Sequence, residues 1–456
     1  MRERAIVTTD DTIVAIATPP GRGGIGVIRL SGPAAPGIAR KIVNSELRPR
    51  YAHFRRFLDK DGAVLEEGIA ICFPAPGSYT GEDVVEFHAH GSRAALDLLV
   101  QRTVELGARQ ARPGEFTERA FHNNRIDLIQ AEAVADLIDS VSSQAARSAI
   151  RSLEGEFSRR INNLLDKIID LRIQVEGSLD FPEEDAGFAT GADVAEKLDS
   201  CRKELDCILA TARQGAILKE GVNVVIAGRP NVGKSTLLNV LAGRDAAIVS
   251  ATPGTTRDLI ELDITLDGIP LHIVDTAGLR TTRDTVEEEG IRRAKTAADR
   301  ADILILIIEC GQPLGMEEKR FLQEVAAGKQ VMILHNKIDL CRVEPKVERG
   351  GNSPVEIFLS ARTGAGLGLL TAQLKELLGM KNLREDVFIA RRRHLEALTR
   401  AGQSIHQAMN VCAGKQGMEL LAEHLRNAQH ALGEITGVYA ADDLLGEIFS
   451  RFCLGK

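Results

Sequence analysis

Aromatic side chains are scarce in this chain of 456 residues, which contains no tryptophan and only 4% aromatic residues. Proteins that bind single-stranded nucleic acid without sequence preference usually stack bases on several exposed aromatic rings. The composition therefore argues against a base-stacking platform. The formal net charge of −7 also excludes a polycation that would bind nucleic acid non-specifically, so any contact with RNA must be local.

The cysteines are few and unpaired in spacing. There are seven of them, an odd number, and no two form a Cys-x-x-Cys motif. Disulfide frameworks and structural zinc sites normally require paired cysteines. The sequence predicts neither, and it favours the reducing environment of the cytoplasm.

Long apolar runs are also missing. The longest candidate, Ile303–Ile308, is bounded by Asp302 and Glu309 and is far shorter than the ~20 residues of a spanning helix. We expect this run to be a buried strand and expect no association with a membrane. The N-terminus, Met1–Arg4, carries mixed charge and leads to no apolar core of the signal-peptide type, so export is not expected.

Three kinds of sequence pattern follow one another along the chain, which is long enough for roughly three domains. Short β-rich runs and Gly/Pro turns up to about Ala120 indicate a small α+β domain. Between about Gly221 and Gly379, β-rich runs alternate with helical stretches, as in a parallel α/β sheet. On either side of that segment apolar residues recur at helical spacing, first Leu153, Phe157, Ile161, Leu164, Leu165 and Ile168 up to about Arg213, later Leu420, Leu421, Leu425, Ala428, Leu432 and Ile435.

The simplest account of this order is an α/β domain inserted into a helical domain. We therefore predict an N-terminal domain at 1–120, the two halves of a helical domain at 121–218 and 380–456, and the α/β domain at 219–379. Two independent helical domains are the alternative.

The strongest motif is Gly228–Ser235, which fits G-x-x-x-x-G-K-S and directly follows the strand-like run Val222–Ala227. In this motif the glycines let backbone N–H groups surround phosphates. Lys234 supplies a charge to the β and γ oxygens, and Ser235 can ligate Mg²⁺ at the start of the next helix.

Two further motifs suit the phosphates and the metal. Asp275–Gly278 follows the strand-like run Leu271–Val274, where an aspartate can hold the Mg²⁺ shell and a glycine N–H can sense the γ-phosphate. Gly254–Asp258 is a turn-rich segment between the Gly228–Ser235 motif and Asp275, and its hydroxyls are suited to closing over the metal.

A base-binding motif comes next. Val331–His335 runs into Asn336–Asp339, whose aspartate can accept hydrogen bonds from N1–H and the 2-amino group of guanine, two donors that adenine lacks. Ser360 and Ala361 follow the run Val355–Leu359 and would complete the loop around the base. Because these motifs occur in this order, each at the end of a strand-like run, the sequence predicts a Ras-like guanine-nucleotide domain with a parallel sheet.

One position departs from the Ras pattern. Leu279 stands where that pattern has a glutamine that orients water, and leucine cannot do so. The acidic run from Asp284 to Glu289 is the nearest source of a substitute, although it also suits a solvated helix start with acidic residues at the positive end of the dipole.

Outside these motifs the chain resembles the MnmE (TrmE) family of tRNA-modifying GTPases over essentially its whole length. The segments that carry the resemblance are Ala17–Gly24, Ser78–Asp83, Pro113–Phe121 and the ending Phe452–Lys456. The family usually ends in C-I-G-K, so Leu454 is a departure, and Arg125 stands where lysine is common. The fold implied is a Ras-like GTPase domain inserted into an α-helical domain, preceded by an α+β tetrahydrofolate-binding domain.

The resemblance also implies partners and chemistry. It implies a homodimer formed through the N-terminal domain and a complex with the flavoprotein MnmG (GidA). That complex adds an aminomethyl or carboxymethylaminomethyl group at carbon 5 of wobble uridine in tRNA. The one-carbon unit would come from a 5-formyl- or 5,10-methylene-tetrahydrofolate, with Arg29, Glu86, Arg125 and Lys456 as its contacts. From the residues alone, Arg29 also suits an ordinary surface ion pair.

Motifs and resemblance together give the nucleotide site and its ions. Mg²⁺ would be held by Ser235 and Thr256. K⁺, bound when two GTPase domains meet, would be held by Asn231, Ser250, Thr252 and Thr255. The residues expected to contact GTP or GDP are Asn231, Val232, Gly233, Lys234, Ser235, Thr236, Ser250, Thr255, Thr256, Asp275, Thr276, Ala277, Gly278, Asn336, Lys337, Asp339, Ser360 and Ala361.

Two residues are predicted to be catalytic. Glu287 matches the family's water-orienting glutamate, and Cys453 is a thiol expected near the folate. Arg391–His394 suits either a tRNA contact or a solvated basic helix start. The alternative to a tRNA-modifying enzyme is a GTPase switch that binds ribosomal RNA and acts only by conformation.

Overall fold

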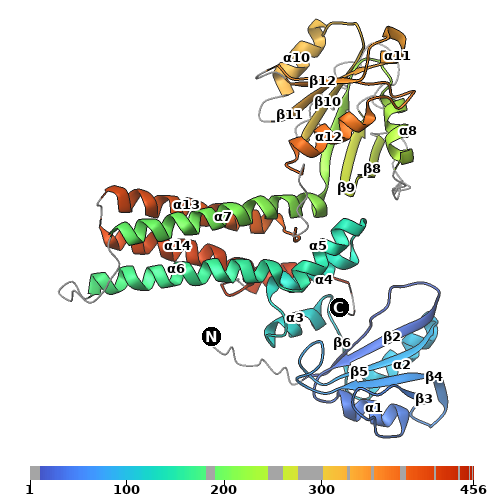
Figure 1. Ribbon diagram of the computed structural model, residues 1–456. Coiled ribbons are helices and arrows are strands. Elements are labelled where there is room, and N and C mark those ends of the chain that lie inside the picture. Colours follow the sequence, from blue (N-terminus) through green and yellow to red (C-terminus); the bar gives the residue numbers. More distant parts are fainter. Residues whose placement is uncertain are drawn as a thin grey trace. The chain divides into compact units, whose positions relative to one another are not determined.

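The computed structural model describes most of the chain (Figure 1). No helix in the part it describes is long and apolar enough to cross a membrane. The chain divides into two compact units: Met1–Ala135, Leu153–Val194 and Gln407–Lys456 form the first, and Asp136–Ser152 and Ala195–His406 form the second. The described residues are 11–180, 191–244, 260–275, 301–325, 329–350, 354–380, 387–414, 417–439, 442–450, 452, 453 and 455.

The first unit begins with a mixed six-stranded sheet whose strand order is β3-β4-β5-β2-β1-β6. All neighbours are antiparallel except β1 and β6, which are parallel. The strands are β1 (Ile13–Ile16), β2 (Gly23–Ser31), β3 (His53–Leu58), β4 (Val64–Phe73), β5 (Val84–Gly91) and β6 (Arg109–Gln110).

One face of this sheet carries the core of the domain. Ile28, Leu30 and Phe87 alternate with more exposed residues, as the two-residue period of a strand requires. They pack with α1 (Ala35–Val43) and α2 (Arg93–Glu105) in one apolar cluster. The opposite side of β2 and β5 is therefore left for polar side chains such as Arg29 and Glu86. The strands expected from the β-rich runs are confirmed.

Helices complete the first unit: α3 (Glu115–His122), α4 (Leu128–Ile138) up to Ala135, α6 (Glu156–Asp180), α14 (Met418–Thr436) and α15 (Asp442–Ser450). Asp127 and Gln130 cap the start of α4 reciprocally. The Gln130 N–H donates to Asp127 Oδ1 at 2.8 Å, and the Asp127 N–H donates to Gln130 Oε1 at 3.0 Å. α6 and α14 pack side by side (Figure 1), so segments far apart in sequence share one core.

The two predicted apolar stripes lie mostly on α6 and α14, with two corrections. Leu153 ends α5 (Ser143–Leu153) and is separated from α6 by Gly155, whose φ of +80° ends the helical path. Leu420 is 44% exposed and does not belong to the buried stripe of α14. The helical segment before the α/β sheet is also longer than predicted, because α7 (Gly191–Glu220) ends at Glu220 rather than near Arg213.

The second unit contains a seven-stranded sheet of order β12-β13-β11-β10-β7-β9-β8. The strands from β13 to β9 are parallel, and the two edge strands, β12 and β8, are antiparallel to their neighbours. The strands are β7 (Val222–Ala227), β8 (Ile260–Leu266), β9 (Ile269–Asp275), β10 (Ile303–Glu309), β11 (Gln330–Asn336), β12 (Lys346–Glu348) and β13 (Val355–Phe358).

Both faces of this sheet are buried. Ile303, Ile305 and Ile307 belong to one apolar cluster, whereas Leu304 and Leu306 belong to another, so consecutive side chains of β10 point into two cores. This confirms Ile303–Ile308 as a buried strand. Helices connect the strands as expected of a parallel sheet: α8 (Lys234–Arg244), α10 (Met316–Val325), α11 (Ile338–Cys341) and α12 (Leu367–Leu377).

The helix that leads into the sheet contacts the segment that leaves it. The Gln214 side chain of α7 donates from Nε2 to the carbonyl oxygen of Gly379 at 2.8 Å, where the chain has left α12. Nearby, Gly215 packs so closely on Phe388 that a Cβ would lie 1.9 Å from its carbonyl oxygen. The segment enters and leaves the α/β sheet through adjacent positions, in agreement with an insertion.

A buried carboxylate ties this region together. Asp136 is 6% exposed and accepts from Lys219 of α7 and, at 2.7 Å, from Nη2 of Arg391. Arg391 precedes α13 (Arg392–Gly414), in which Arg392 is exposed. Of the basic residues at this helix start, Arg391 therefore pairs with the buried Asp136.

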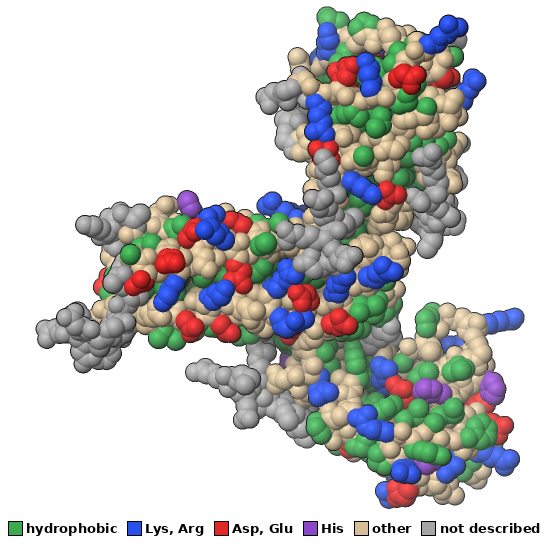
Figure 2. Space-filling view, viewed as in Figure 1, with side chains coloured by type: hydrophobic (Ala, Val, Ile, Leu, Met, Phe, Trp, Pro, Cys, Tyr) green, Lys and Arg blue, Asp and Glu red, His purple; other side chains and the backbone are tan. Residues whose placement is uncertain are grey.

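Acidic and basic side chains are interspersed over the face of the molecule shown in Figure 2.

Candidate functional site

The phosphate loop joins β7 to α8, as its motif predicts. Gly228 has φ +149°, and a Cβ there would lie 2.3 Å from the carbonyl oxygen of Ile307, so only glycine fits against β10. Asn231 adopts the left-handed region with φ +64°. The Lys234 side chain is 6% exposed, and its Nζ donates at 2.7 Å to the carbonyl oxygens of Gly228 and Arg229. The ammonium is thus held inside the curve of the loop.

Asn336 connects the phosphate loop to the base loop. It ends β11 and is 3% exposed, and its Nδ2 donates to the Val232 carbonyl oxygen at 2.7 Å. Its Oδ1 accepts from the Ala361 N–H at 2.9 Å. One buried amide therefore joins three of the predicted segments, and a Cβ on Gly233 would collide with it at 2.2 Å.

The rest of the base loop lies beside it. Lys337 has φ +66°, and its Nζ is 3.3 Å from Glu309 Oε2 at the end of β10. The Ser360 hydroxyl donates to Asp339 Oδ1 at 2.7 Å. The Asp339 carboxylate is therefore oriented by the loop that was predicted to close around the base.

The metal-binding and switch positions are only partly described. Ser235 and Thr236 are exposed in the first turn of α8. Asp275 is the last residue of β9 and is paired in register with Ile226 of β7, next to the phosphate loop. The other predicted residues of this group lie outside the described residues: Ser250, Thr252, Thr255, Thr256, Thr276, Ala277, Gly278 and Glu287.

A second candidate site lies on the polar face of the first sheet. Arg29 and Glu86 are register partners on β2 and β5, and both Nε and Nη2 of Arg29 are 2.9 Å from Glu86 Oε1. Their side chains are 22% and 15% exposed, so the pair is more buried than an ordinary surface ion pair. His88 Nε2 lies 3.0 Å from the other carboxylate oxygen.

Two aromatic rings flank the Arg29 guanidinium. Its Cζ lies 5.4 Å from the ring centre of Tyr79 and 5.9 Å from that of Phe116. Burial raises the pKa of the Tyr79 phenol, although a hydrogen bond with Thr117 and the charge of Arg29 oppose the shift. The phenol stays protonated at neutral pH, so the Tyr79 ring beside Arg29 is uncharged.

Sequence reasoning missed His88, Tyr79 and Phe116 as members of this site. A signal existed for His88, because residues two apart on a strand share a face and Glu86 was already a candidate. Tyr79 and Phe116 come from a loop and a helix, and only the folded structure brings them to Arg29. Nothing in the sequence indicated that Arg229, inside the phosphate motif, forms an ion pair with Glu318.

Arg125 and the chain end lie on the same unit. Arg125 is exposed, and a Cβ on Gly81, in the loop that carries Tyr79, would lie 3.2 Å from its Cγ. Cys453 is exposed, and its carbonyl oxygen accepts from the Gly114 N–H at 3.5 Å. Gly455 fits against β1, where a Cβ would lie 2.3 Å from the Ile16 carbonyl oxygen. Lys456 lies outside the described residues.

The position of Cys453 follows from the start of α3. Gly114, its backbone partner, stands two positions before Phe116, whose ring faces Arg29. The terminal segment with exposed Cys453 therefore contacts the backbone two positions before Phe116.

A charged cluster supports this helix start. Glu115 and Arg119 are 3% and 5% exposed, and the Glu115 carboxylate accepts from Arg109, Arg119 and the Arg112 N–H. Burial alone would raise the pKa of Glu115. The hydrogen bonds from Arg109 and Arg112 and the charges of Arg109 and Arg119 outweigh it and hold the pKa below the ordinary value.

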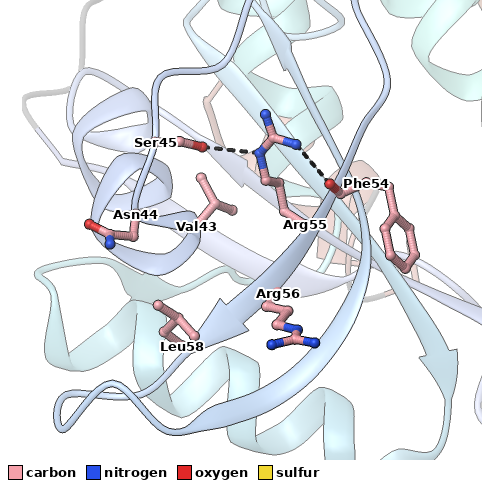
Figure 3. Close-up of a pocket in the computed structure, with 7 residues that line it drawn as sticks. All are labelled: Val43, Asn44, Ser45, Phe54, Arg55, Arg56 and Leu58. Atoms are coloured by element: carbon pink, nitrogen blue, oxygen red, sulfur yellow. Dashed lines mark hydrogen bonds between the residues drawn. The ribbon is translucent and has the colours of Figure 1, made fainter.

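A separate pocket of about 510 Å³ lies between the end of α1 and β3 (Figure 3). Arg55 in its wall donates from Nε to Ser45 Oγ at 3.1 Å and from Nη1 to the Phe54 carbonyl oxygen at 2.9 Å. None of the predicted site residues line it, and we assign it no role. Its lining residues are Val43, Asn44, Ser45, Phe54, Arg55, Arg56 and Leu58.

Family models match both parts of the chain. A model described as GTP-binding protein TrmE N-terminus matches residues 12–125, and one described as MnmE helical domain matches residues 128–453. The second match begins at the start of α4, ends just after α15 and spans the seven-stranded sheet between them. This agrees with an α/β domain inserted into a helical one.

Known proteins similar to the chain cover its whole length. It is 52% identical to the tRNA modification GTPase MnmE of Pseudomonas aeruginosa (strain UCBPP-PA14), over 98% of this chain and 99% of that protein. It is 51% identical to the tRNA modification GTPase MnmE of Coxiella burnetii (strain Dugway 5J108-111), again over 98% and 99%. Among solved structures, the G domain of the T. maritima FeoB iron transporter is 28% identical, covering 35% of this chain and 98% of that chain with a TM-score of 0.26.

Identity of about one half over both full lengths, together with family models for both parts, establishes the relationship. Asn336 and Ser360 join the segments that were predicted to hold phosphate and guanine. The chain is a GTP-hydrolysing enzyme. It belongs to the MnmE family of tRNA modification GTPases.

Proposed function

We propose that this enzyme hydrolyses GTP to support modification of the wobble uridine of tRNA. With the flavoprotein MnmG (GidA) it would add an aminomethyl or carboxymethylaminomethyl group at carbon 5, using a 5-formyl- or 5,10-methylene-tetrahydrofolate. The observation that carries this proposal is that one chain combines guanine-nucleotide loops with a separate Arg29–Glu86 site and an exposed thiol at Cys453.

Guanine selection follows from the base loop. Ser360 donates to Oδ1 of Asp339, which leaves the other carboxylate oxygen and further lone pairs to accept from guanine N1–H and its 2-amino group. Adenine offers neither donor at these positions and would leave those acceptor positions of Asp339 unpaired. The Lys234 ammonium would meet the β and γ phosphate oxygens of GTP.

The residues present fit Mg²⁺, which prefers hard oxygen ligands. Ser235 offers an exposed hydroxyl at the start of α8, and β9, which ends in Asp275, is the neighbour of the strand that leads into the phosphate loop. Ser235 and Thr256 would hold the ion, which neutralises charge on the phosphates when it is bound.

For hydrolysis we propose a K⁺-dependent meeting of two GTPase domains. Asn231 is exposed on the left-handed turn of the phosphate loop, so its amide oxygen can face a partner domain and an ion. Ser250, Thr252 and Thr255 would supply the other ligands. Glu287 would orient the attacking water in place of the glutamine that Leu279 replaces.

The Arg29 site fits a reduced folate. Glu86 Oε1 faces both Nε and Nη2 of Arg29, and Oε2 faces His88 Nε2 alone. Because each carboxylate oxygen has about two acceptor positions, Oε2 can still accept from an N–H group of a pterin. Arg29 keeps donors for a ligand oxygen, and Tyr79 and Phe116 offer apolar surface. Arg125 and Lys456 would contact the acidic end of the ligand, and the bound folate would supply the one-carbon unit.

Cys453 is proposed to act on the same ligand or on its adduct. Its thiol is exposed, and its backbone is tied to Gly114 at the start of α3, whose Phe116 faces Arg29.

We propose that the homodimer forms through the N-terminal domain and that the enzyme acts in the cytoplasm. We keep the domain boundaries at 1–120, 121–218, 219–379 and 380–456.

The test is mass spectrometry of wobble uridines in tRNA from cells that lack the gene and are complemented with variants. The unmutated gene should restore the modified uridine. Cys453→Ser should not, although its GTP hydrolysis persists, whereas the matched exposed-cysteine control Cys207→Ser should restore it fully. Unchanged uridines in the gene deletion would reject the proposed function and favour a GTPase switch acting on ribosomal RNA.

A further inference from the structure

Arg229, the first variable residue of the phosphate motif, makes an ion pair with a helix that the motif does not include. Its Nε lies 2.5 Å from Glu318 Oε1, and its Nη2 donates to Glu318 Oε2 at 3.0 Å. This is a bidentate arrangement, in which two parallel hydrogen bonds fix orientation as well as distance. Glu318 lies in the first turn of α10 and is 8% exposed, whereas Arg229 is 52% exposed.

The backbone of Arg229 has a second role. Its carbonyl oxygen is one of the two that accept from Lys234 Nζ, at 2.7 Å. The side chain that Glu318 holds and the carbonyl that holds the phosphate-binding ammonium therefore belong to one residue. A backbone rotation at this residue would therefore disturb the ion pair and the carbonyl together.

The loop needs such external anchors because its own conformation is costly. Gly228 and Gly233 have φ +149° and +100°, and Asn231, which has a Cβ, has φ +64°. Non-glycine residues in such conformations persist only when their surroundings hold them there. Gly228 is held against β10 and Val232 by Asn336, and between them Arg229 is held by Glu318.

We propose that Arg229 and Glu318 are positioning residues for GTP binding: their ion pair fixes the Arg229 carbonyl and thereby the Lys234 ammonium. The pair acts on the phosphates through Lys234 and touches no reacting atom itself. Helix α10 thereby becomes part of the support of the phosphate loop.

Gly315 provides an unusual way to test the pair without removing either charge. A Cβ at this position would lie 2.2 Å from Arg229 Nη2 and 2.3 Å from Glu318 Oε2. Both are the ends of flexible side chains, and the backbone of Gly315 is not in the positive-φ region. Gly315→Ala should therefore separate the ion pair while the fold is preserved.

The experiment measures dissociation constants of GTP and GDP by calorimetry on the full-length protein, with thermal unfolding in parallel. We expect Arg229→Ala, Glu318→Gln and Gly315→Ala each to weaken both nucleotides about tenfold, with an unfolding temperature within a few degrees of the unmutated value. The control is Arg320→Ala, which breaks the Arg320–Glu324 pair on the same helix and should leave both constants unchanged.

The double variant distinguishes positioning from independent contributions. If the two residues act as one device, Arg229→Ala combined with Glu318→Gln should lose about tenfold, no more than either change alone. A roughly hundredfold loss in the double variant would overturn the proposal. So would unchanged nucleotide affinity in Gly315→Ala, or a fall in unfolding temperature with no change in affinity, which is the result expected of a purely structural ion pair.

Discussion

Asp339 lies in the short helix α11 and Ser360 in the loop after β13, and the two are joined directly, since the Ser360 hydroxyl donates to Asp339 Oδ1 at 2.7 Å. The carboxylate that would accept from guanine is therefore already oriented by that loop. Preorganisation of this kind lowers the entropy that ordering the site would otherwise cost on binding.

Asp339→Asn should weaken GTP binding by about 1–3 kcal/mol, because an amide N–H would face the guanine donors and leave them unpaired. Xanthine nucleotide, which offers an acceptor there, should bind better than it does to the unmutated protein. Calorimetry with both nucleotides checks this, with Asp263→Asn on edge strand β8 as the control carboxylate. Unchanged GTP affinity in Asp339→Asn would reject the guanine-reading role.

Glu287→Ala should retain GTP binding and lose most of its turnover, because the attacking water would lack its partner. Glu288→Ala and Glu289→Ala remove the same charge from neighbouring positions and should keep turnover. Initial rates of phosphate release measure this. The unmutated protein should also be slower in Na⁺ than in K⁺, and equal rates in the two salts would contradict the cation role.

Arg29→Lys should weaken binding of 5-formyl-tetrahydrofolate by about tenfold while GTP affinity stays unchanged. Lysine keeps the charge but has one nitrogen, so it cannot reach a carboxylate oxygen of Glu86 with two nitrogens as Arg29 does, and it lacks the planar guanidinium that lies near the rings of Tyr79 and Phe116. Equilibrium dialysis measures the binding. Arg55→Lys, in the pocket beside α1, is the control, and equal losses in both variants would show a non-specific effect.

Glu115 makes the first unit sensitive to acid. Its pKa is lowered in the folded state, so its contribution to stability is present above the ordinary carboxyl pKa of about 4.5 and is lost as the pH falls through the folded-state pKa. Glu115→Gln should reduce the free energy of unfolding by about 1–3 kcal/mol at pH 7 and flatten this part of the pH dependence.

Tyrosine fluorescence during urea denaturation can follow the first unit alone. The chain has no tryptophan, and its three tyrosines, Tyr51, Tyr79 and Tyr439, all belong to that unit. Glu118→Gln is the control, because Glu118 pairs with the exposed Arg112 and such pairs contribute less than about 1 kcal/mol. Equal effects of the two substitutions would contradict a special role of the buried cluster.

The sequence predicted most of the second unit because its signals are local. The nucleotide motifs that the structure describes lie at or just after the ends of β7, β9, β11 and β13, and strands buried on both faces are recognisable as continuous apolar runs such as Ile303–Ile308. The insertion was also predictable, from the return of helical periodicity after Gly379. The helix break at Gly155 was not, since the apolar period continues through it and only the positive φ ends α5.

The polar contacts between distant segments could not be predicted. Arg29 and Glu86 lie 57 positions apart, and Arg229 and Glu318 lie 89 positions apart. Charged residues are common in both regions, and no local pattern selects one partner over another. Pairing of this kind depends on strand register and helix placement, which arise only when the whole unit folds.

The hydrogen bond between Gln214 and Gly379 has a mechanical consequence. Because the two ends of the inserted α/β segment lie side by side, the segment could be removed and a linker of about three residues could connect Gln214 to Gly379. The two chain connections between the nucleotide-binding sheet and the helices also run side by side at Gln214 and Gly379. Tension or twist generated around GTP would enter α7 and the segment before α13 together, so the two would move as a pair rather than independently.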